Sequence, residues 1–280
     1  MTGRAGGASA TSLGPGLATL AIVGASFGFA SISIATVLGT RAGTPLTALV
    51  SGRFLLAGLL LAVLVGGRPA LAIGRDRALP LLLRGGVAQA LINLLTLSAL
   101  AYIPAASAVF LFYTYPAWVA IFAAVRGSER IGRLRAVALL LSLAGIVVMV
   151  GLPGAASLHP LGMVLSLTGA VVYAIYLPLL RRLQQDVDPL VATFYIAAGV
   201  FTILATVGAI RGELTWRLPL VSLAAVAWLA VVSTVVTFWL FMRGLATLGP
   251  VQTSIVATVE PFFAAPVSYT HLTLPTNREV

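Results

Sequence analysis

Nine stretches of about twenty mostly apolar residues fill the 280-residue sequence almost end to end, and only short loops separate them. A stretch of this length can cross the hydrocarbon core of a bilayer as a helix. The strands of a membrane barrel would be about half as long and would alternate polar with apolar residues. Because backbone polar groups cannot stay unpaired in lipid, the sequence predicts an all-α integral membrane protein.

The predicted spans fall into a group of five and a group of four. The first five cover residues 15–38, 45–65, 81–101, 105–125 and 134–151. The last four cover residues 161–180, 189–210, 218–242 and 250–267. The first apolar run is longer than the 7–15 residues or so of a signal-peptide core, so we expect residues 15–38 to be retained as a span.

The composition agrees with a lipid-exposed exterior. Hydrophobic residues make up 60% of the chain and charged residues 9%, and the mean hydropathy is +1.07. A chain of this kind avoids water on its outside as well as in its core. The sequence contains no stretch that would form a separate soluble domain.

The arginines predict the orientation of the chain in the membrane. All 17 basic residues are arginine. With a cytoplasmic N-terminus, twelve of the arginines outside the membrane core lie on the inside and three, Arg41, Arg211 and Arg217, on the outside. The positive-inside rule therefore predicts a multi-pass protein of the cytoplasmic (inner) membrane with residues 1–14 in the cytoplasm. The net charge of +10 is then a topology signal, and we expect no nucleic-acid partner.

The sequence offers little material for catalysis or for metal binding. There is no cysteine, and the two histidines, His159 and His271, are far apart in the chain. No paired carboxylates and no Ser/His/Asp arrangement lie within the spans. We therefore expect neither an enzyme nor a metal or cofactor site.

The second half of the chain repeats features of the first. A shift of 144 residues places Pro45-Leu46 on Pro189-Leu190, and a shift of 145 places Tyr115-Pro116 on Glu260-Pro261. A repeat of five helices crosses the membrane an odd number of times, so its second copy would be inverted relative to the first. Inverted repeats are a recurrent architecture of secondary transporters that work by alternating access.

Several of these segments together resemble the drug/metabolite transporter superfamily, in particular its EamA-type members with two five-helix repeats. The matching segments are Arg53-Phe54, the strip from Ala105 to Pro116, Gly127-Ser128-Glu129-Arg130, Gly145-Ile146, Gly249 to Ser254, and Val259-Glu260-Pro261. The resemblance implies ten helices, both ends in the cytoplasm, and movement of small metabolites or amino acids, often outward.

The end of the chain departs from this pattern. Where the resemblance implies a tenth apolar helix, residues 268–280 form a polar tail rich in threonine. We interpret the tail as a foreign, adapter-like end; a natural short tail is the alternative. The expected organisation is an N-terminal segment (1–14), a first repeat (15–152), a second repeat with four visible helices (153–267) and the atypical tail (268–280).

Two charged residues lie well inside the predicted spans, Arg53 and Glu260. A charge at the centre of a span is costly and is expected to face a cavity or a partner. Neither recurs in the other half, because Arg53 falls on Ala197 and Glu260 on Tyr115. Both are candidates for substrate or ion coupling, and Glu260 is a candidate proton carrier. The alternative is that they only brace helices.

Polar and aromatic residues in the spans are further candidates for lining a central cavity; these are Asn93, Tyr113, Tyr115, Tyr173, Tyr176 and Trp239. Packing or a place at the membrane interface is the alternative for each of them. Pro116 and Pro261 are candidates for helix kinks at matched places in the two halves.

The sequence thus predicts a secondary transporter, of the exporter kind, for small metabolites, amino acids or drug-like solutes. Two alternatives stay open: a polytopic membrane protein without transport, such as an assembly partner or a membrane enzyme, and a channel. The identity of the solute, the direction of transport, proton coupling and pairing into a homodimer are not fixed by the sequence.

Overall fold

The computed structural model describes residues 13–67, 71–103, 105–127, 132–150, 159–215 and 217–263, and these residues form helices and connecting turns without strands. Predictions about residues 1–12 and about the tail 268–280 lie outside them. Within the described residues, seven helices are long and apolar enough to cross a membrane. The predicted all-α membrane bundle is therefore confirmed at this level.

Most predicted spans coincide with helices of the structure. The first segment of the chain contains α1 (Pro15–Arg41), α2 (Leu46–Leu64), α4 (Arg75–Pro80), η1 (Leu81–Gly85), α5 (Gly86–Ala99), α6 (Ala105–Phe112), α7 (Tyr115–Val125) and α8 (Arg133–Val150). The second contains α9 (Pro160–Leu183), α10 (Pro189–Ile210), α11 (Leu220–Ala230), η2 (Val231–Val236) and α12 (Thr237–Ala257). The elements η1 and η2 are short π-helical stretches within longer helices.

The count of seven differs from the nine predicted spans at two places. Helix α8, which coincides with the predicted span 134–151, is not among the seven, and residues 220–257 count as one helix of 38 residues. That long helix is interrupted at Gly249, whose backbone angles (φ 77°, ψ 169°) are not helical. Glycine alone adopts this conformation readily, and Pro250 follows it. The interruption lies between the predicted spans 218–242 and 250–267, so the eighth span is longer than predicted.

Two further turns interrupt the helical course of the chain. A turn at Tyr113-Thr114 separates α6 from α7, and a turn at Thr258-Val259 follows α12. Each turn is followed closely by a proline, Pro116 or Pro261. The two turns are 145 residues apart, which is the shift that aligned these strips in the sequence.

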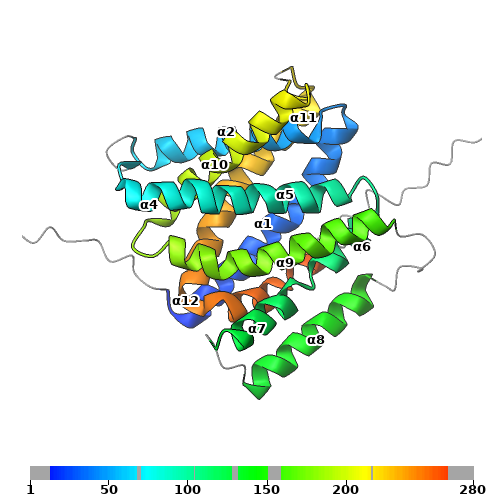
Figure 1. The fold of residues 1–280 in the computed structure, drawn as a ribbon, viewed down its shortest axis with the longest axis vertical. Coiled ribbons are helices and arrows are strands. Elements are labelled where there is room, and N and C mark those ends of the chain that lie inside the picture. Colours follow the sequence, from blue (N-terminus) through cyan, green and yellow to red (C-terminus); the bar gives the residue numbers. More distant parts are fainter. Residues whose placement is uncertain are drawn as a thin grey trace, which may run out of the picture.

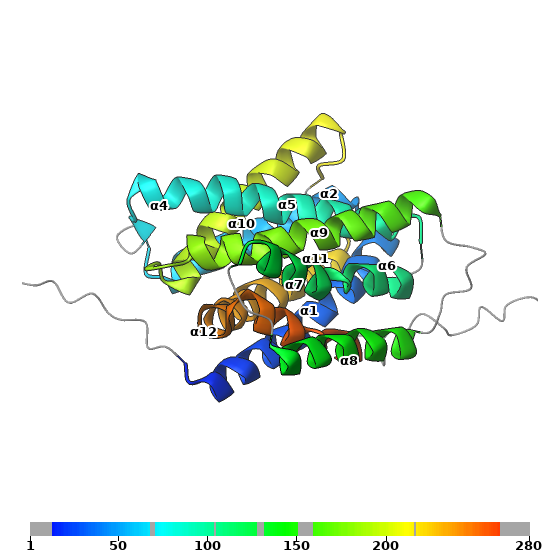
Figure 2. The ribbon, with the colours of Figure 1, turned by 60° about the horizontal axis from the view of Figure 1, so that its bottom comes forward.

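The helices of the two segments interlock. Helix α1 packs along η2 and α12 of the second segment, while α9 packs along α5 of the first, and α2 packs on α10. In Figure 1, α4 and α5 form one line across the molecule with α9 directly beside it. Helix α8 lies at the periphery, next to α6 and α12, as Figure 2 shows from a second direction.

Glycines allow the closest of these helix contacts. A Cβ atom on Gly28 of α1 would collide with the Thr237 side chain at the start of α12. A Cβ atom on Gly169 of α9 would lie 2.7 Å from Thr96 Cγ2 of α5. Small residues commonly permit such close approach between membrane helices. Both contacts join the first span of one segment to the third span of the other, so the segments meet in a reciprocal way.

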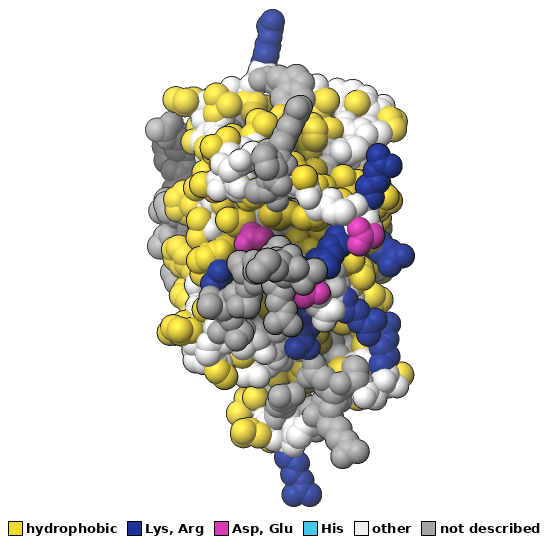
Figure 3. Space-filling model, turned by 90° about the vertical axis from the view of Figure 1, so that its left-hand side faces the viewer, with side chains coloured by type: hydrophobic (Ala, Val, Ile, Leu, Met, Phe, Trp, Pro, Cys, Tyr) yellow, Lys and Arg dark blue, Asp and Glu magenta, His cyan; other side chains and the backbone are white. Residues whose placement is uncertain are grey.

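The outside of the bundle is apolar over its length, and the end drawn in Figure 3 is rich in charged side chains. Large side chains such as Val63 and Leu220 are about four-fifths exposed, which suits a surface in contact with lipid. Figure 3 views the end where α4 begins and α9 ends, and arginine side chains gather there. This gathering fits the arginine asymmetry of the sequence.

Candidate functional site

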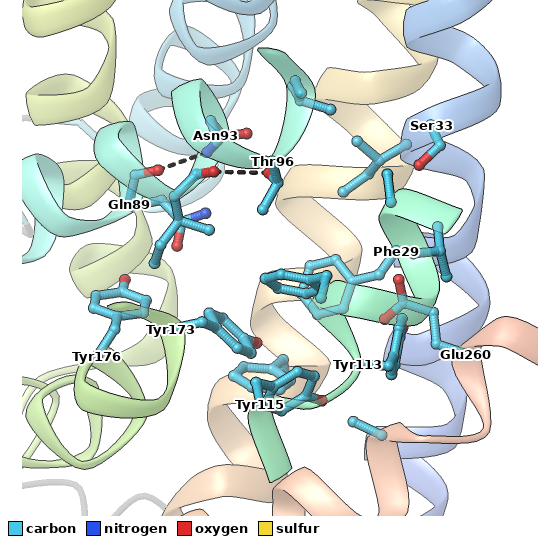
Figure 4. A pocket seen from close by; sticks show the side chains of 18 of the residues that line it. Phe29, Ser33, Gln89, Asn93, Thr96, Tyr113, Tyr115, Tyr173, Tyr176 and Glu260 are labelled. Carbon is cyan, nitrogen blue, oxygen red and sulfur yellow. Dashed lines mark hydrogen bonds between the residues drawn. The ribbon is translucent and has the colours of Figure 1, made fainter. Parts of the chain in front are cut away.

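A cavity of about 140 Å³ lies between the two segments, in the middle of the bundle. Its walls come from α1, α2, α5, α6 and α7 of the first segment and from α9 and α12 of the second, together with Glu260 beyond α12. Figure 4 shows these side chains converging from helices that are distant in sequence. The cavity therefore exists only because the segments interlock.

The break between α6 and α7 supplies the aromatic wall of the cavity. Helix α6 ends at Phe112, and α7 begins at Tyr115 with Pro116 as its second residue, where no backbone donor is needed. The turn places Tyr113 and Tyr115 on the cavity with ring centroids 5.7 Å apart. Tyr173 of α9 meets Tyr115 edge to face at 4.7 Å, and Tyr176 continues the row at 6.3 Å from Tyr173.

A second aromatic group, Phe29 of α1 with Phe238 and Phe241 of α12, also lines the cavity. Phe29 lies edge to face with each of the other two, at centroid distances of 5.5 Å. Such perpendicular pairs are the favoured geometry for aromatic rings. Aromatic rings packed against one another therefore form a large part of the cavity wall.

Glu260 is the only acidic residue among the described residues that line the cavity. It is the first residue after the turn at Thr258-Val259 and is half-buried. Its side chain lies beside Tyr113, and Tyr115 and Tyr173 line the same cavity (Figure 4). An acid in this setting can attract a cation or exchange a proton.

Two tyrosine hydroxyl groups in the wall have no well-aligned hydrogen-bond partner. The Tyr113 and Tyr176 side chains are 2% and 1% exposed, and the hydroxyl oxygens of both are buried without such a bond. A buried polar group without a partner costs about 1–3 kcal/mol. The Tyr113 hydroxyl group lies beside the Glu260 carboxyl group, so the Tyr176 hydroxyl group is the one for which a bound solute would recover that cost.

Polar side chains of α5 form another part of the wall. Asn93 Nδ2 donates to the backbone oxygen of Gln89 at 2.8 Å, and Thr96 Oγ1 donates to the backbone oxygen of Ile92 at 2.7 Å (Figure 4). The Gln89 side chain extends from the same face. The cavity thus has an acidic, aromatic part near Glu260 and a neutral polar part at α5.

Arg53 is buried to 1% exposure and is bound to the π-helical stretch of the other segment. Its Nε donates to Thr234 Oγ1 at 2.7 Å, and its Nη2 donates to the Ser233 backbone oxygen at 3.2 Å. The guanidinium group also lies 4.9 Å from the centre of the Phe54 ring. Arg53 therefore braces α2 against η2 through neutral partners.

The structure brings most of the predicted residues to this cavity. Its walls include Arg53, Asn93, Tyr113, Tyr115, Tyr173, Tyr176 and Glu260. Trp239 is placed elsewhere, because its ring lies 5.0 Å from the Arg243 guanidinium carbon and does not line the cavity. Pro116 and Pro261 lie directly after the turns that interrupt their helices.

Sequence reasoning missed several wall residues, namely Phe29, Ser33, Gln89, Thr96, Phe112, Phe238 and Phe241. Gln89 carried a usable signal, since it precedes Asn93 by one helical turn and the two polar side chains share a face. The phenylalanines carried none, because apolar residues also face lipid. Among the described residues, no group of three histidine, cysteine or acidic side chains could hold a metal ion.

The comparison with protein families identifies the class of protein to which the chain belongs. The model of the EamA-like transporter family matches twice, at residues 16–151 and 160–275, and so covers most of the chain. The chain therefore belongs to the EamA-like transporter family, and the resemblance seen in the sequence is confirmed. This is a family of membrane transporters of small solutes and not of enzymes.

Comparisons with individual proteins show which known structure has a similar fold. No curated protein matches the chain. Among solved structures, one crystal structure superposes with a TM-score of 0.72 over 93% of this chain and 90% of that one, at 20% sequence identity. At this identity the similarity shows a shared fold alone.

Proposed function

We propose that the protein exports a small organic solute across the cytoplasmic membrane by alternating access, with the cavity between the two segments as its transport site. The observation that carries the proposal is the lining of one cavity by both EamA-like segments. A site at the junction of two repeats can be exposed to either side when one repeat rocks against the other.

The symmetry of the helix breaks supports an inverted pair of repeats, divided near residues 152 and 153. The turns at Tyr113-Thr114 and Thr258-Val259 are 145 residues apart, and each borders the cavity. The Gly28–Thr237 and Gly169–Thr96 contacts are also related to each other, because 141 residues separate the two glycines and 141 separate the two threonines. These paired features are what a duplicated five-helix unit would leave behind.

The breaks also supply places where the structure can move. A helix interrupted by a turn and a proline has lost part of its backbone hydrogen bonding, so its two pieces can change their angle at lower cost than an intact helix. Tyr115 and Glu260 sit at these points. Movement of either piece would change the cavity walls directly.

Glu260 supports coupling of transport to protons. It is the one acidic wall residue within the described part of the chain, and Tyr113 beside it has a hydroxyl group free to interact with it. In this scheme a proton and the solute use the carboxyl group in turn, so outward movement of the solute is driven by inward movement of protons.

Counterflow in proteoliposomes tests the proposed function. Vesicles that contain the protein are loaded with a mixture of unlabelled amino acids, amines and sugars, and labelled members of each class are added outside. A carrier takes up its labelled substrate transiently above equilibrium and saturates with concentration. Flux that rises without saturation would favour a channel, and vesicles without protein give the baseline.

The direction of transport requires a separate measurement in cells. Cells that express the protein are preloaded with the solute identified by counterflow, and its release is followed after dilution. Faster release than from cells that express Glu260→Gln supports export. Faster accumulation instead would show that the protein imports its substrate.

A further inference from the structure

We infer that a groove between α1 and α11 holds one acyl chain of an anionic phospholipid, whose phosphate group is bound by Arg41 and Arg217. This groove, called here the α1–α11 groove, shares none of its described lining residues with the central cavity. It lies on the outside of the bundle and is not part of the proposed transport path. The inference therefore goes beyond the proposed function and does not depend on it.

The α1–α11 groove is large and opens toward the membrane. Its volume is about 550 Å³, within the range of about 300–1,000 Å³ that is usual for ligand sites. Small side chains of both helices, among them Ala30 and Ala225, contribute to its wall. Larger side chains of the wall, such as Phe27 and Trp228, are about half exposed. A membrane lipid can therefore enter the groove from the side.

The polar side chains in the wall of the groove are already bonded within the protein. Trp228 Nε1 donates to Ser31 Oγ at 2.9 Å, and Ser31 Oγ donates to the Gly28 backbone oxygen at 2.7 Å. The hydroxyl oxygens of Ser31 and Ser233 are also 2.9 Å apart. These bonds use the hydrogen-bonding capacity of the Ser31 hydroxyl group. The groove therefore suits an acyl chain, which needs no such partner, better than a polar solute.

The length of the groove matches one leaflet of a bilayer. Along α1 its lining residues run from Phe27 to Leu38, which corresponds to about 16 Å at the rise of a helix. Half of the hydrocarbon core of a membrane is about 15 Å thick. The groove therefore follows the path that one acyl chain takes from the surface of the membrane to its middle.

One end of the groove carries two arginines. It lies where α1 ends and α11 begins, and Ser222 Oγ donates to the Gly39 backbone oxygen at 3.2 Å, which joins these two helix ends. Arg41 is the last residue of α1, and Arg217 lies three residues before α11 begins; both are exposed. Arginine binds phosphate oxygens with charged hydrogen bonds. A phospholipid with its chain in the groove places its phosphate at this level.

The charges at this end are available to a lipid. The acid closest to Arg217 in the sequence is Glu213, and its Oε2 already accepts a hydrogen bond from Thr47 Oγ1 at 2.7 Å. Arg41 and Arg217 also belong to the three arginines that the predicted orientation places outside, where the positive-inside rule calls for few. Orientation therefore does not explain them, whereas binding of a lipid phosphate does.

Other occupants fit the groove less well. A second copy related by a two-fold axis along the membrane normal would bring the arginines of both copies to the same level, where like charges repel. The tail 268–280 is polar and rich in threonine, and it contains Asn277, Arg278 and Glu279. Such a segment would lose its hydration in an apolar groove.

Trp228 provides a reporter inside the groove. In a variant that keeps Trp228 and replaces the other three tryptophans by phenylalanine, the fluorescence comes from this site alone. The protein is reconstituted into vesicles of phosphatidylcholine and phosphatidylglycerol, with brominated chains on one lipid or the other, because bromine quenches a tryptophan that it contacts. Quenching against lipid ratio gives the relative affinity of the two lipids. We expect about tenfold preference for phosphatidylglycerol, which falls as salt is raised.

Matched variants separate the two parts of the site. The pair Arg41→Gln with Arg217→Gln should abolish the preference, whereas Arg211→Gln, an exposed arginine at the end of α10 on the same side, should keep it. Ala224→Phe places a ring in the groove and should lower the preference several-fold. Ala227→Phe adds the same ring at an exposed position of α11 outside the groove and should leave the preference unchanged.

The readout is binding and requires no transport, so it stays valid if the proposed function fails. Equal affinity for the two lipids would overturn the inference, and so would a preference that survives the paired arginine substitution. A preference that survives Ala224→Phe would show that the arginines bind a lipid outside the groove. Absence of quenching at every lipid ratio would mean that protein, either the tail or a second copy, covers the groove, and would equally overturn it.

Discussion

Tyr115 and Glu260 hold equivalent positions in the two EamA-like segments: each is the first residue after the turn that interrupts its helix, and both line the same cavity. The equivalence is one of backbone position and not of chemistry, since one residue carries an aromatic ring and the other a carboxyl group. The duplicated scaffold thus places two different functional groups at related points of one site.

The proposed coupling role of Glu260 predicts a specific loss. In proteoliposomes with an imposed pH gradient, net solute flux through Glu260→Gln should fall about tenfold or more, because an amide cannot take up and release the proton. Flux is measured with and without the gradient. Asp76→Asn serves as the control and should behave as the unmodified protein. Gradient-dependent flux that persists in Glu260→Gln would remove this carboxyl group from coupling.

The contact of Gly28 with Thr237 predicts a loss of stability on adding a single methyl group. Gly28→Ala should lower the free energy of unfolding by about 1–3 kcal/mol, because the new Cβ collides with the Thr237 side chain. Gly169→Ala should do the same against Thr96. Thermal unfolding in detergent, followed by tryptophan fluorescence, measures both.

Gly58→Ala is the matched control for these glycines. Gly58 lies inside α2, and nothing is within 4 Å of the position its Cβ would take. Its substitution should be neutral or should stabilise the helix by about 0.5–1 kcal/mol. If all three alanine variants melted alike, close packing at Gly28 and Gly169 would not be what holds the segments together.

The bonds from Arg53 to η2 predict an energetic coupling between the two segments. Arg53→Ala should destabilise the protein by about 1.5–3 kcal/mol, because a charged hydrogen-bonding group is lost from a buried site. Arg53→Lys should recover only part of the lost stability. Lysine keeps the positive charge but lacks the planar fork that reaches Thr234 and Ser233 together.

A double-mutant cycle with Thr234→Val isolates the contact. We expect an interaction energy of about 0.5–3 kcal/mol between Arg53→Ala and Thr234→Val, as for residues in direct contact. Unfolding of the two single variants and the double variant supplies the values. Strict additivity would mean that the bond contributes nothing to holding α2 against η2.

The arginine asymmetry predicts which loops face the cytoplasm. Because the chain contains no cysteine, single cysteines can be introduced without removing others. Gln185→Cys, in the turn between α9 and α10, should react with a membrane-impermeant maleimide only after the cells are opened. Thr215→Cys, between α10 and α11, should react in intact cells. The opposite pattern would place the N-terminus outside.

The helices were largely predictable from the sequence because lipid imposes one simple requirement, a long apolar run with paired backbone groups. The ends of α2 and α10, for instance, lie within a residue of the predicted bounds 45–65 and 189–210. The junction within α12 was less predictable, because residues 220–248 remain helical well past the predicted end at Met242 until Gly249 interrupts the helix.

The site was predictable where a side chain in a span carried a polar or charged group, as the four tyrosines of the wall also do. Arg53, Asn93 and Glu260 stood out for that reason, and all three line the cavity. Phe29 and Phe238 did not, because their role depends on contacts between distant parts of the chain. The bond from Arg53 to η2 was equally hidden, since it joins residues 181 positions apart.

The reciprocal packing of the segments has a consequence for biogenesis. Helix α1 leaves the ribosome first, yet the surface that it covers belongs mainly to α11, η2 and α12. During synthesis it must wait in the bilayer, solvated by acyl chains, until almost the whole polypeptide has been inserted. Docking of α1 is therefore a late step, in which lateral association of finished helices completes what membrane insertion began.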